Sequence, residues 1–198
     1  SRLAKIASND GWEVCVLDNL STGLQSNAES LEIKGVEVYI GDIRDKSLVT
    51  DLVAKSTAVI HLAAQVSVPL SIQHPKETMD INVKGTQNVI DSCLQKGVKR
   101  LVVASSAAVY GEADSLPLNE DAAGELLSPY AESKWTNEQQ IVEARSSGLE
   151  ASCLRFFNVY GTGQRTDGAY ASVIPKFVDM MANGVAPRIF GDGLQTRD

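Results

Sequence analysis

Residues 36–62 read VEVYIGDIRDKSLVTDLVAKSTAVIHL, and this stretch decides the fold class. The apolar run at residues 36–40 starts after a glycine and stops at a Gly-Asp pair, which predicts a short buried strand. Asp45 is expected to cap the N-terminus of a helix that runs to about Lys55. A second apolar run follows at residues 58–62. Strand, helix and strand in this order predict a right-handed βαβ unit with parallel strands.

The same alternation continues on both sides of this unit. Gly97 and Gly148 are expected to end two further helices, and Pro129 to start the second of them. The fold class is therefore α/β, with a doubly wound parallel sheet whose strands are buried on both faces and bind ligands at their carboxyl ends. The remaining predicted strands are residues 12–17 (WEVCVL), 101–104 (LVVA) and 151–157 (ASCLRFF), and the remaining helices are residues 1–10, 83–94 and 129–147.

Composition argues against several classes of protein. The chain has 198 residues, of which 43% are hydrophobic and 22% charged, and this is the balance of an ordinary globular protein. No apolar run approaches the ~20 residues of a membrane-spanning helix. A net charge of −7 without a basic stripe argues against nucleic-acid binding. Neither the three widely spaced cysteines (Cys15, Cys93, Cys153) nor His61 and His74 have metal-ligand spacing, so we expect a cytoplasmic protein without a metal site.

Asp18 ends the first predicted strand, where a dinucleotide-binding sheet carries an acidic residue that accepts hydrogen bonds from the adenosine ribose. No Arg or Lys occurs between Asp18 and Lys34 to compensate a 2′-phosphate, so NAD is favoured over NADP. The alternative is that Asp18 only starts a turn, because Asp-Asn-x-Ser-x-Gly is good turn chemistry. The glycine-rich turn that holds the pyrophosphate in such folds is not found in the sequence. We expect it, together with the first strand of the sheet, upstream of Ser1.

Tyr130 and Lys134 stand four residues apart on one face of a predicted helix. A phenol is a poor base at neutral pH because its pKa lies near ~10. A neighbouring ammonium and a positive nicotinamide ring both favour the phenolate, which makes the pair a proton shuttle beside a hydride acceptor. The pair also occurs by chance, but Ser106 at the end of a predicted strand is placed to bridge a substrate oxygen and Tyr130.

Eight motifs, taken in their order along the chain, carry a resemblance to a known family. They are residues 18–23 (DNLSTG), 41–45 (GDIRD), 61–65 (HLAAQ), 82–86 (NVKGT), 105–111 (SSAAVYG), Tyr130 with Lys134, 155–161 (RFFNVYG) and 191–198 (GDGLQTRD). With them the chain resembles the extended short-chain dehydrogenase/reductases, and among these the NAD-dependent nucleotide-sugar epimerase/dehydratase family. The resemblance implies a Rossmann-like fold, bound NAD and a UDP-sugar substrate.

The resemblance also implies roles for individual residues. Ser106, Tyr130 and Lys134 would be the catalytic set. The cofactor would be bound by Asp18, Asn19, Leu20, Ser21, Thr22, Gly23, Asp42, Ile43, Leu62, Ala63, Ala64, Gln65, Asn82 and Phe157, together with Tyr130 and Lys134. The substrate would be bound by Ser106, Asn158, Ile174, Phe190 and Arg197, with the Arg197 guanidinium clamping the diphosphate.

The implied activity is 4-epimerisation of a UDP-hexose through a transient 4-keto sugar. Dehydratases and decarboxylases of the family need an acid–base group after the catalytic hydroxyl, and Ala107-Ala108 cannot supply one. Residues 64–69 and Asn158-Val159 look closer to epimerases of N-acetylhexosamines or glucuronate, so the sugar stays open. A non-catalytic nucleotide-binding protein is the alternative from another class, and the intact catalytic set argues against it.

The resemblance divides the chain at residue 165. Residues 1–165 would form an N-terminally truncated NAD-binding domain, and residues 166–198 the start of a C-terminally truncated sugar-binding lobe. This chain alone is therefore expected to be inactive. Two helical stretches, residues 76–95 and 129–146, would supply the interface of a homodimer.

Overall fold

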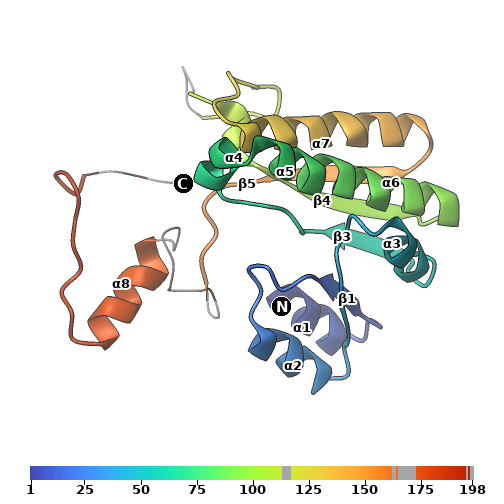
Figure 1. Ribbon diagram of the computed structural model, residues 1–198, viewed down its shortest axis with the longest axis horizontal. Helices are drawn as coiled ribbons and strands as arrows, with labels where there is room; N and C mark the ends of the chain where they lie inside the picture. The colour runs from blue at the N-terminus through green and yellow to red at the C-terminus, as the bar shows by residue number, and fades with distance from the viewer. Residues whose placement is uncertain (113–116, 162–163, 165–172, 195, 197–198) are drawn as a thin grey trace. The chain divides into compact units, whose positions relative to one another are not determined.

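The computed structural model describes residues 1–112, 117–161, 164, 173–194 and 196. The chain separates into two compact units, Ser1–Leu154 and Arg155–Asp198. Figure 1 shows the elements, which follow in the order α1 (Arg2–Asn9), β1 (Cys15–Asp18), α2 (Gln25–Glu32), β2 (Glu37–Ile40), α3 (Lys46–Val53), β3 (Ala58–His61), α4 (Val68–Gln73), α5 (Pro75–Met79), a π-helical turn η1 (Asp80–Lys84), α6 (Gly85–Lys96), β4 (Arg100–Ser106), a 3₁₀ turn η2 (Ala107–Tyr110), α7 (Pro129–Ser146), β5 (Glu150–Phe156) and α8 (Val173–Ala182).

The strands form two sheets rather than one. β1 and β2 pair in parallel, with Cys15 opposite Glu37, and a second sheet has the order β3-β4-β5, in which Ala58 of β3 lies opposite Arg100 of the parallel β4. The α/β fold with parallel strands is therefore confirmed. The sheet is divided because, among the described residues, no strand pairs with the second edge of β1 or of β3. The expectation of a further strand before Ser1 stays a prediction.

This division changes the burial of the edge strands. Ile60 of β3 is 52% exposed, whereas Leu101 and Val103 of the central strand β4 are each 1% exposed. The expectation that β3 is buried on both faces is therefore wrong, because the face with Ala58 and Ile60 is exposed and only the face with Val59 and His61 points to the interior.

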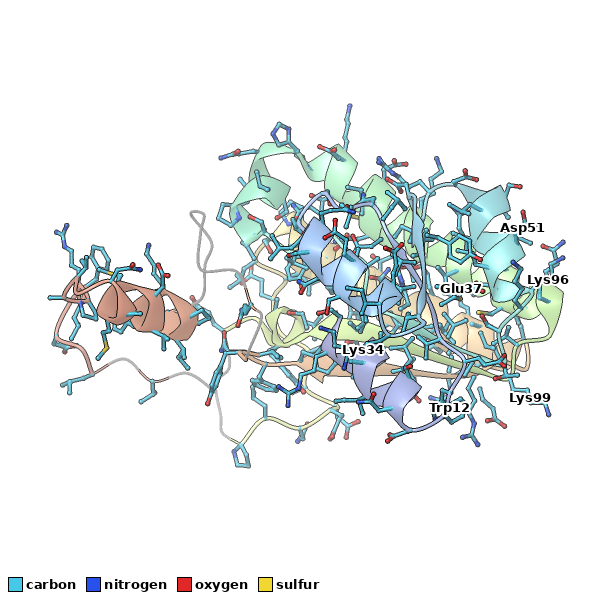
Figure 2. All side chains as sticks on the ribbon, turned by 90° about the horizontal axis from the view of Figure 1, so that it is seen from below. Trp12, Lys34, Glu37, Asp51, Lys96 and Lys99 are labelled. Atoms are coloured by element: carbon cyan, nitrogen blue, oxygen red, sulfur yellow. The ribbon has the colours of Figure 1, made fainter. Side chains whose placement is uncertain are left out.

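Most predicted helix ends agree with the structure. The side chain of Asp45 accepts a hydrogen bond from the Leu48 N–H (3.1 Å) and caps α3. Gly97 ends α6 in the left-handed conformation at φ 69°. The first strand, however, begins at Cys15 rather than at Trp12. The Trp12 N–H instead donates to the carbonyl of Ala7 (3.0 Å) in the turn after α1, and its side chain, labelled in Figure 2, is 63% exposed.

One hydrophobic core joins helices α3, α6 and α7 to strands β4 and β5. Figure 1 shows α6 and α7 side by side next to β4. Cys93, predicted as a small core residue, is fully buried there, while Cys15 and Cys153 are half-buried. None of the helices in the described part of the chain combines the length and apolar character needed to cross a membrane. The core consists of Ile43, Val49, Val53, Val89, Ile90, Cys93, Val98, Leu101, Val103, Ile141, Ala144, Leu149 and Ala151.

Gly85 is the point at which α6 meets the loop after β2. A Cβ atom on Gly85 would lie 2.5 Å from Cδ1 and 2.7 Å from Cγ1 of Ile43, too short for carbon atoms in contact. Ile43 is 8% exposed and belongs to the core. Glycine at this position therefore lets the loop pack directly against the start of the helix.

Gly85→Ala should destabilise the protein by about 1–3 kcal/mol, since the added methyl must displace Ile43, although a better helix former offsets part of the cost. The measurement is the free energy of unfolding from a urea titration. The double variant Gly85→Ala/Ile43→Val lacks the nearest clashing atom and should recover part of the loss. An unchanged free energy in the single variant would show that Ile43 moves aside at no cost.

Candidate active site

The structure brings the three predicted catalytic residues together. Ser106 ends β4, while Tyr130 and Lys134 lie on the buried face of α7 with exposed fractions of 9% and 4%. The Lys134 ammonium donates to the carbonyl of Ala104 (2.9 Å) and lies 6.0 Å from the centre of the Tyr130 ring. The Ser106 side chain lies close enough to the Tyr130 phenol to lower the pKa of Tyr130. The hydroxyl, phenol and ammonium therefore form one cluster at the carboxyl end of β4.

Burial pushes both titratable groups of this cluster toward their neutral forms. The pKa of Tyr130 is raised, because burial disfavours the phenolate more than the hydrogen bond with Ser106 favours it. The pKa of Lys134 is lowered to about 8, mainly by burial, with a small opposing effect from Cys153. Lys134 is not among the groups that set the pKa of Tyr130 here, and the expectation that the ammonium and a nicotinamide ring together favour the phenolate stays a prediction. A further positive charge near the phenol is needed to favour the phenolate.

A buried amide connects this cluster with the loop after β3. The side chain of Asn82, 1% exposed, accepts from the Gln65 N–H (2.8 Å) and donates to the Gln65 carbonyl (3.0 Å). The same Nδ2 donates to the Ser133 hydroxyl (2.9 Å), which donates to the Tyr130 carbonyl (2.7 Å). Residues 62–65, predicted to bind the cofactor, are thus tied at Gln65 to the helix that carries Tyr130 and Lys134.

The loop after β1 folds around the carboxylate of Asp18. The Leu20 N–H donates to Asp18 Oδ1 (2.8 Å), and a Cβ on Gly23 would lie 3.0 Å from the same oxygen. Glycine therefore leaves room beside an exposed carboxylate, an arrangement that fits a ribose diol. Asn19 donates to Asp42 Oδ2 (3.4 Å), so the two predicted adenosine-binding loops lie together.

Arg44 was not predicted as a site residue, and it links this adenosine end to the π-helical turn. Its guanidinium contacts Asp42 (2.7 Å) and Asp80 (3.2 Å). Hydrogen bonds from Arg44 lower the pKa of Asp42 to about 2. Asp80 is the first residue of η1, the turn that also contains Asn82.

His61 is a structural residue, as the sequence suggests. It is 6% exposed, and its Nε2 lies 2.9 Å from the Thr86 hydroxyl. Burial, with a smaller contribution from the charge of Lys134, lowers the pKa of His61 to about 3, so the ring is neutral at physiological pH. Within the described ranges, no three His, Cys, Asp or Glu side chains gather where they could hold a metal ion.

Most predicted substrate-binding residues belong to the second unit. Asn158, Ile174 and Phe190 lie there, whereas Arg197 lies outside the described residues. Phe157, predicted to bind the cofactor, lies in the same unit. Phe190, expected to contact the uracil, is 71% exposed, and the guanidinium carbon of Arg188 lies 5.0 Å from its ring centre. The substrate-binding roles of these residues stay predictions.

Sequence reasoning missed the polar residues that support the site from α7. Ser133 and Asn137 are fully buried and lie on the same face of α7 as Tyr130 and Lys134. A signal was present, since small polar side chains three, four and seven residues apart share a face with the apolar Ile141. Polar residues on an otherwise buried helical stripe indicate a hydrogen-bonded network.

Comparisons with known proteins match the whole chain. The sequence profile described as the NAD dependent epimerase/dehydratase family covers residues 1–198. A Methanocaldococcus jannaschii protein whose name proposes a UDP-glucose 4-epimerase is 41% identical over 197 residues, which are 98% of this chain and 63% of that protein. The UDP-N-acetyl-alpha-D-glucosaminuronate decarboxylase of Bacillus cytotoxicus is 32% identical over 203 residues, which are 100% of this chain and 62% of that protein.

Solved structures share the fold. The UDP-glucose 4-epimerase of Thermotoga maritima, with UDP-glucose, matches with a TM-score of 0.91 and 30% identity, over 100% of this chain and 64% of that one. The UDP-N-acetylglucosamine 4-epimerase of Methanobrevibacter ruminantium, in complex with UDP-N-acetylmuramic acid, has a TM-score of 0.91 and 34% identity over 98% and 64%. The UDP-glucose 4-epimerase of Thermus thermophilus, in complex with NAD, has a TM-score of 0.83 and 36% identity over 92% and 59%. The chain therefore spans less than two thirds of the length of each of these proteins.

The buried neutral His61 should make the protein sensitive to acid. The unfolded chain binds a proton at this histidine below pH ~6.5, whereas the folded chain keeps it neutral down to about pH 3. Stability is therefore fully present above pH ~6.5 and is lost as the pH falls through this window. The measurement is the free energy of unfolding between pH 7 and pH 4.

His61→Gln has no titrating ring and should lose less stability over this range than the unchanged protein. His74→Gln is the matched control, because His74 is the other histidine of the chain and is exposed. Equal pH slopes for His61→Gln and the unchanged protein would contradict the assignment.

Proposed function

The chain belongs to the NAD dependent epimerase/dehydratase family, and from this premise we propose that the protein carrying it is an NAD-dependent 4-epimerase of a UDP-hexose. The observation that carries the proposal is the cluster of Ser106, Tyr130 and Lys134 at the carboxyl end of β4. The two alanines that follow Ser106 support epimerisation over reactions that need a second acid–base group at that place.

Residues can be proposed for both the adenosine end and the nicotinamide end of NAD. Asp18 would accept hydrogen bonds from the ribose, and the loop of Asp42 and Ile43 would flank the adenine. The loop that ends at Gln65 would follow the cofactor toward Tyr130 and Lys134, and the resemblance to the family assigns Phe157 to the nicotinamide side. Bound NAD would supply the acceptor for the hydrogen removed from the sugar carbon and would return it in the second half of the reaction.

In this reaction, the residues of this chain would transfer one proton. The Tyr130 phenolate takes the proton from the sugar 4-hydroxyl while the C4–H bond breaks, and it returns this proton when the C4–H bond forms on the opposite face. Lys134, whose pKa is about 8, is largely charged at neutral pH and stabilises the phenolate. The Ser106 hydroxyl holds the sugar oxygen in reach of Tyr130. No atom is gained or lost, so substrate and product are isomers.

Related activities remain alternatives, and their products differ. Residues 64–69 and Asn158-Val159 favour a UDP-N-acetylhexosamine or UDP-glucuronate 4-epimerase, and a solved relative is named for the N-acetylglucosamine reaction. A curated relative is named as a decarboxylase, and some family members are dehydratases. A non-catalytic nucleotide-binding protein would give no product.

The deciding experiment offers each candidate UDP-sugar to the purified full-length protein that carries this chain, and identifies the product by NMR. The proposal expects the C4 epimer, with no net change in NAD. A 4-keto-6-deoxy sugar would instead indicate a dehydratase, release of carbon dioxide a decarboxylase, and recovery of every substrate unchanged a binding protein.

Tyr130→Phe should lower kcat by a factor of about 10² or more, because the proton acceptor is removed while the ring stays in place. NAD content after purification should remain that of the unchanged protein. Tyr39→Phe is the matched control, since Tyr39 lies on β2, where its hydroxyl donates to Glu37. Full activity in Tyr130→Phe would overturn the catalytic assignment.

We also propose that the protein is a homodimer formed through α6 and α7. Leu94 on α6 and Val142 on α7 are apolar and exposed, at 38% and 57%. Burial of such side chains between two copies would remove apolar surface from water.

Val142→Asp should shift the protein from dimer to monomer, because the interface would bury an unpaired charge. The measurement is the molar mass by light scattering. Ile33→Asp, at an 86% exposed apolar residue at the end of α2, is the control and should leave the mass unchanged. Equal masses for both variants and the unchanged protein would contradict this interface.

A further inference from the structure

Asn137 is a buried amide in the site for which the proposed chemistry gives no task. It lies on α7 one turn after Ser133 and is 0% exposed. Its Nδ2 donates to the Asn82 carbonyl (2.9 Å) and to Gln140 Oε1 (2.9 Å). Its Oδ1 is buried without a hydrogen-bond partner among the described residues. A buried unpaired oxygen costs free energy, so stability alone does not explain an amide at this position.

The contacts of Asn137 and Gln140 concentrate on the π-helical turn η1. The carbonyl of Asn82 accepts a hydrogen bond from the side-chain amide of Asn137. The next carbonyl, that of Val83, accepts one from the side-chain amide of Gln140 (3.1 Å). Gln140 Nε2 also donates to Gln87 on α6 (2.8 Å). A π turn departs from the regular helical ladder, and such turns occur frequently at functional sites. Two side chains of α7 therefore hold the backbone of this irregular turn from outside.

The turn held in this way carries Asn82, whose side chain binds both backbone groups of Gln65. The same side chain is bound to Ser133 and, through it, to the carbonyl of Tyr130. α7 thus contacts Asn82 twice, at its carbonyl through Asn137 and at its amide through Ser133. This double attachment sets the position of the loop at residues 62–67 relative to Tyr130.

We infer that Asn137 is a positioning residue. It holds the π turn so that Asn82 keeps the loop at residues 62–67 in a fixed position relative to Tyr130 and Lys134 on α7. The inference rests on the proposed function in one respect, namely that the loop at residues 62–67 binds NAD. Asn137 itself touches neither reacting atoms nor the loop. It acts through the carbonyl of Asn82.

Asn137→Leu is the decisive variant, because leucine has nearly the shape of asparagine and removes the donor together with the unpaired oxygen. The lost donor should loosen the loop, while removal of the unpaired oxygen limits the cost to global stability. Gln140→Leu is the second variant, since it removes the donor to Val83 and leaves Asn137 in place. Ser92→Ala is the matched control, because Ser92 is fully buried and the change removes its side-chain hydrogen bond with Thr50 (2.9 Å), away from this loop.

The primary measurement is amide hydrogen exchange at residues 62–67 in the protein without cofactor. One lost hydrogen bond of ordinary strength should speed exchange by about fivefold in Asn137→Leu, with a smaller effect in Gln140→Leu and none in Ser92→Ala. The Kd for NAD should rise by a similar factor, while the KM for the UDP-sugar stays within about twofold. A merely structural role would instead change exchange throughout the core and leave the Kd for NAD unaltered.

Unchanged exchange at residues 62–67 in both Asn137→Leu and Gln140→Leu would overturn the inference. Faster exchange in a protein that binds no NAD would support the positioning role and would contradict the proposed function instead. Faster exchange with an unaltered Kd for NAD would overturn the link between this loop and the cofactor. If Asn137→Leu does not fold, Gln140→Leu decides by the same measurement.

Discussion

The hydrogen bonds of the buried Asn82 side chain are the contacts on which the rest of the site depends. One amide satisfies both backbone groups of Gln65, in the loop after β3, and also reaches Ser133 on α7. A loop without regular structure has few means to hold its position, and buried hydrogen bonds to its backbone are among the strongest. The loop is therefore attached, through Asn82, to the helix that carries Tyr130 and Lys134.

Burial sets the protonation of the cluster formed by Ser106, Tyr130 and Lys134. Tyr130 and Lys134 are taken out of water, so the pKa of the phenol is raised and the pKa of the ammonium is lowered to about 8. A buried pair of this kind responds strongly to any charge brought close to it, because the local dielectric is low. A positively charged ring at the nicotinamide position would shift the phenol toward its basic form, and this links catalytic competence to cofactor binding.

A chain of contacts leads from the predicted adenosine-binding loop after β2 to the π turn beside α7. Arg44 joins Asp42 to Asp80, and Asp80 begins the π turn that contains Asn82. The exposed ion pairs of Arg44 contribute little to stability by themselves. Their geometric effect is larger, because they hold the loop after β2 against the same turn that α7 contacts through Asn137 and Gln140.

The sequence by itself determined much of the local structure of this protein and predicted the residues of its candidate site. Apolar runs, caps and glycines predicted the strands and the helices α1, α3, α6 and α7 to within a few residues, but they did not predict α2, α4, α5 or α8. The helical spacing of Tyr130 and Lys134, with Ser106 at a strand end, predicted the cluster. Only the tertiary structure decided that the strands divide between two sheets, that Asn137 supports Asn82, and that burial raises the pKa of Tyr130. The physical reason is that strand edges, buried hydrogen bonds and desolvation depend on segments far apart in the chain, which no local pattern of residues records.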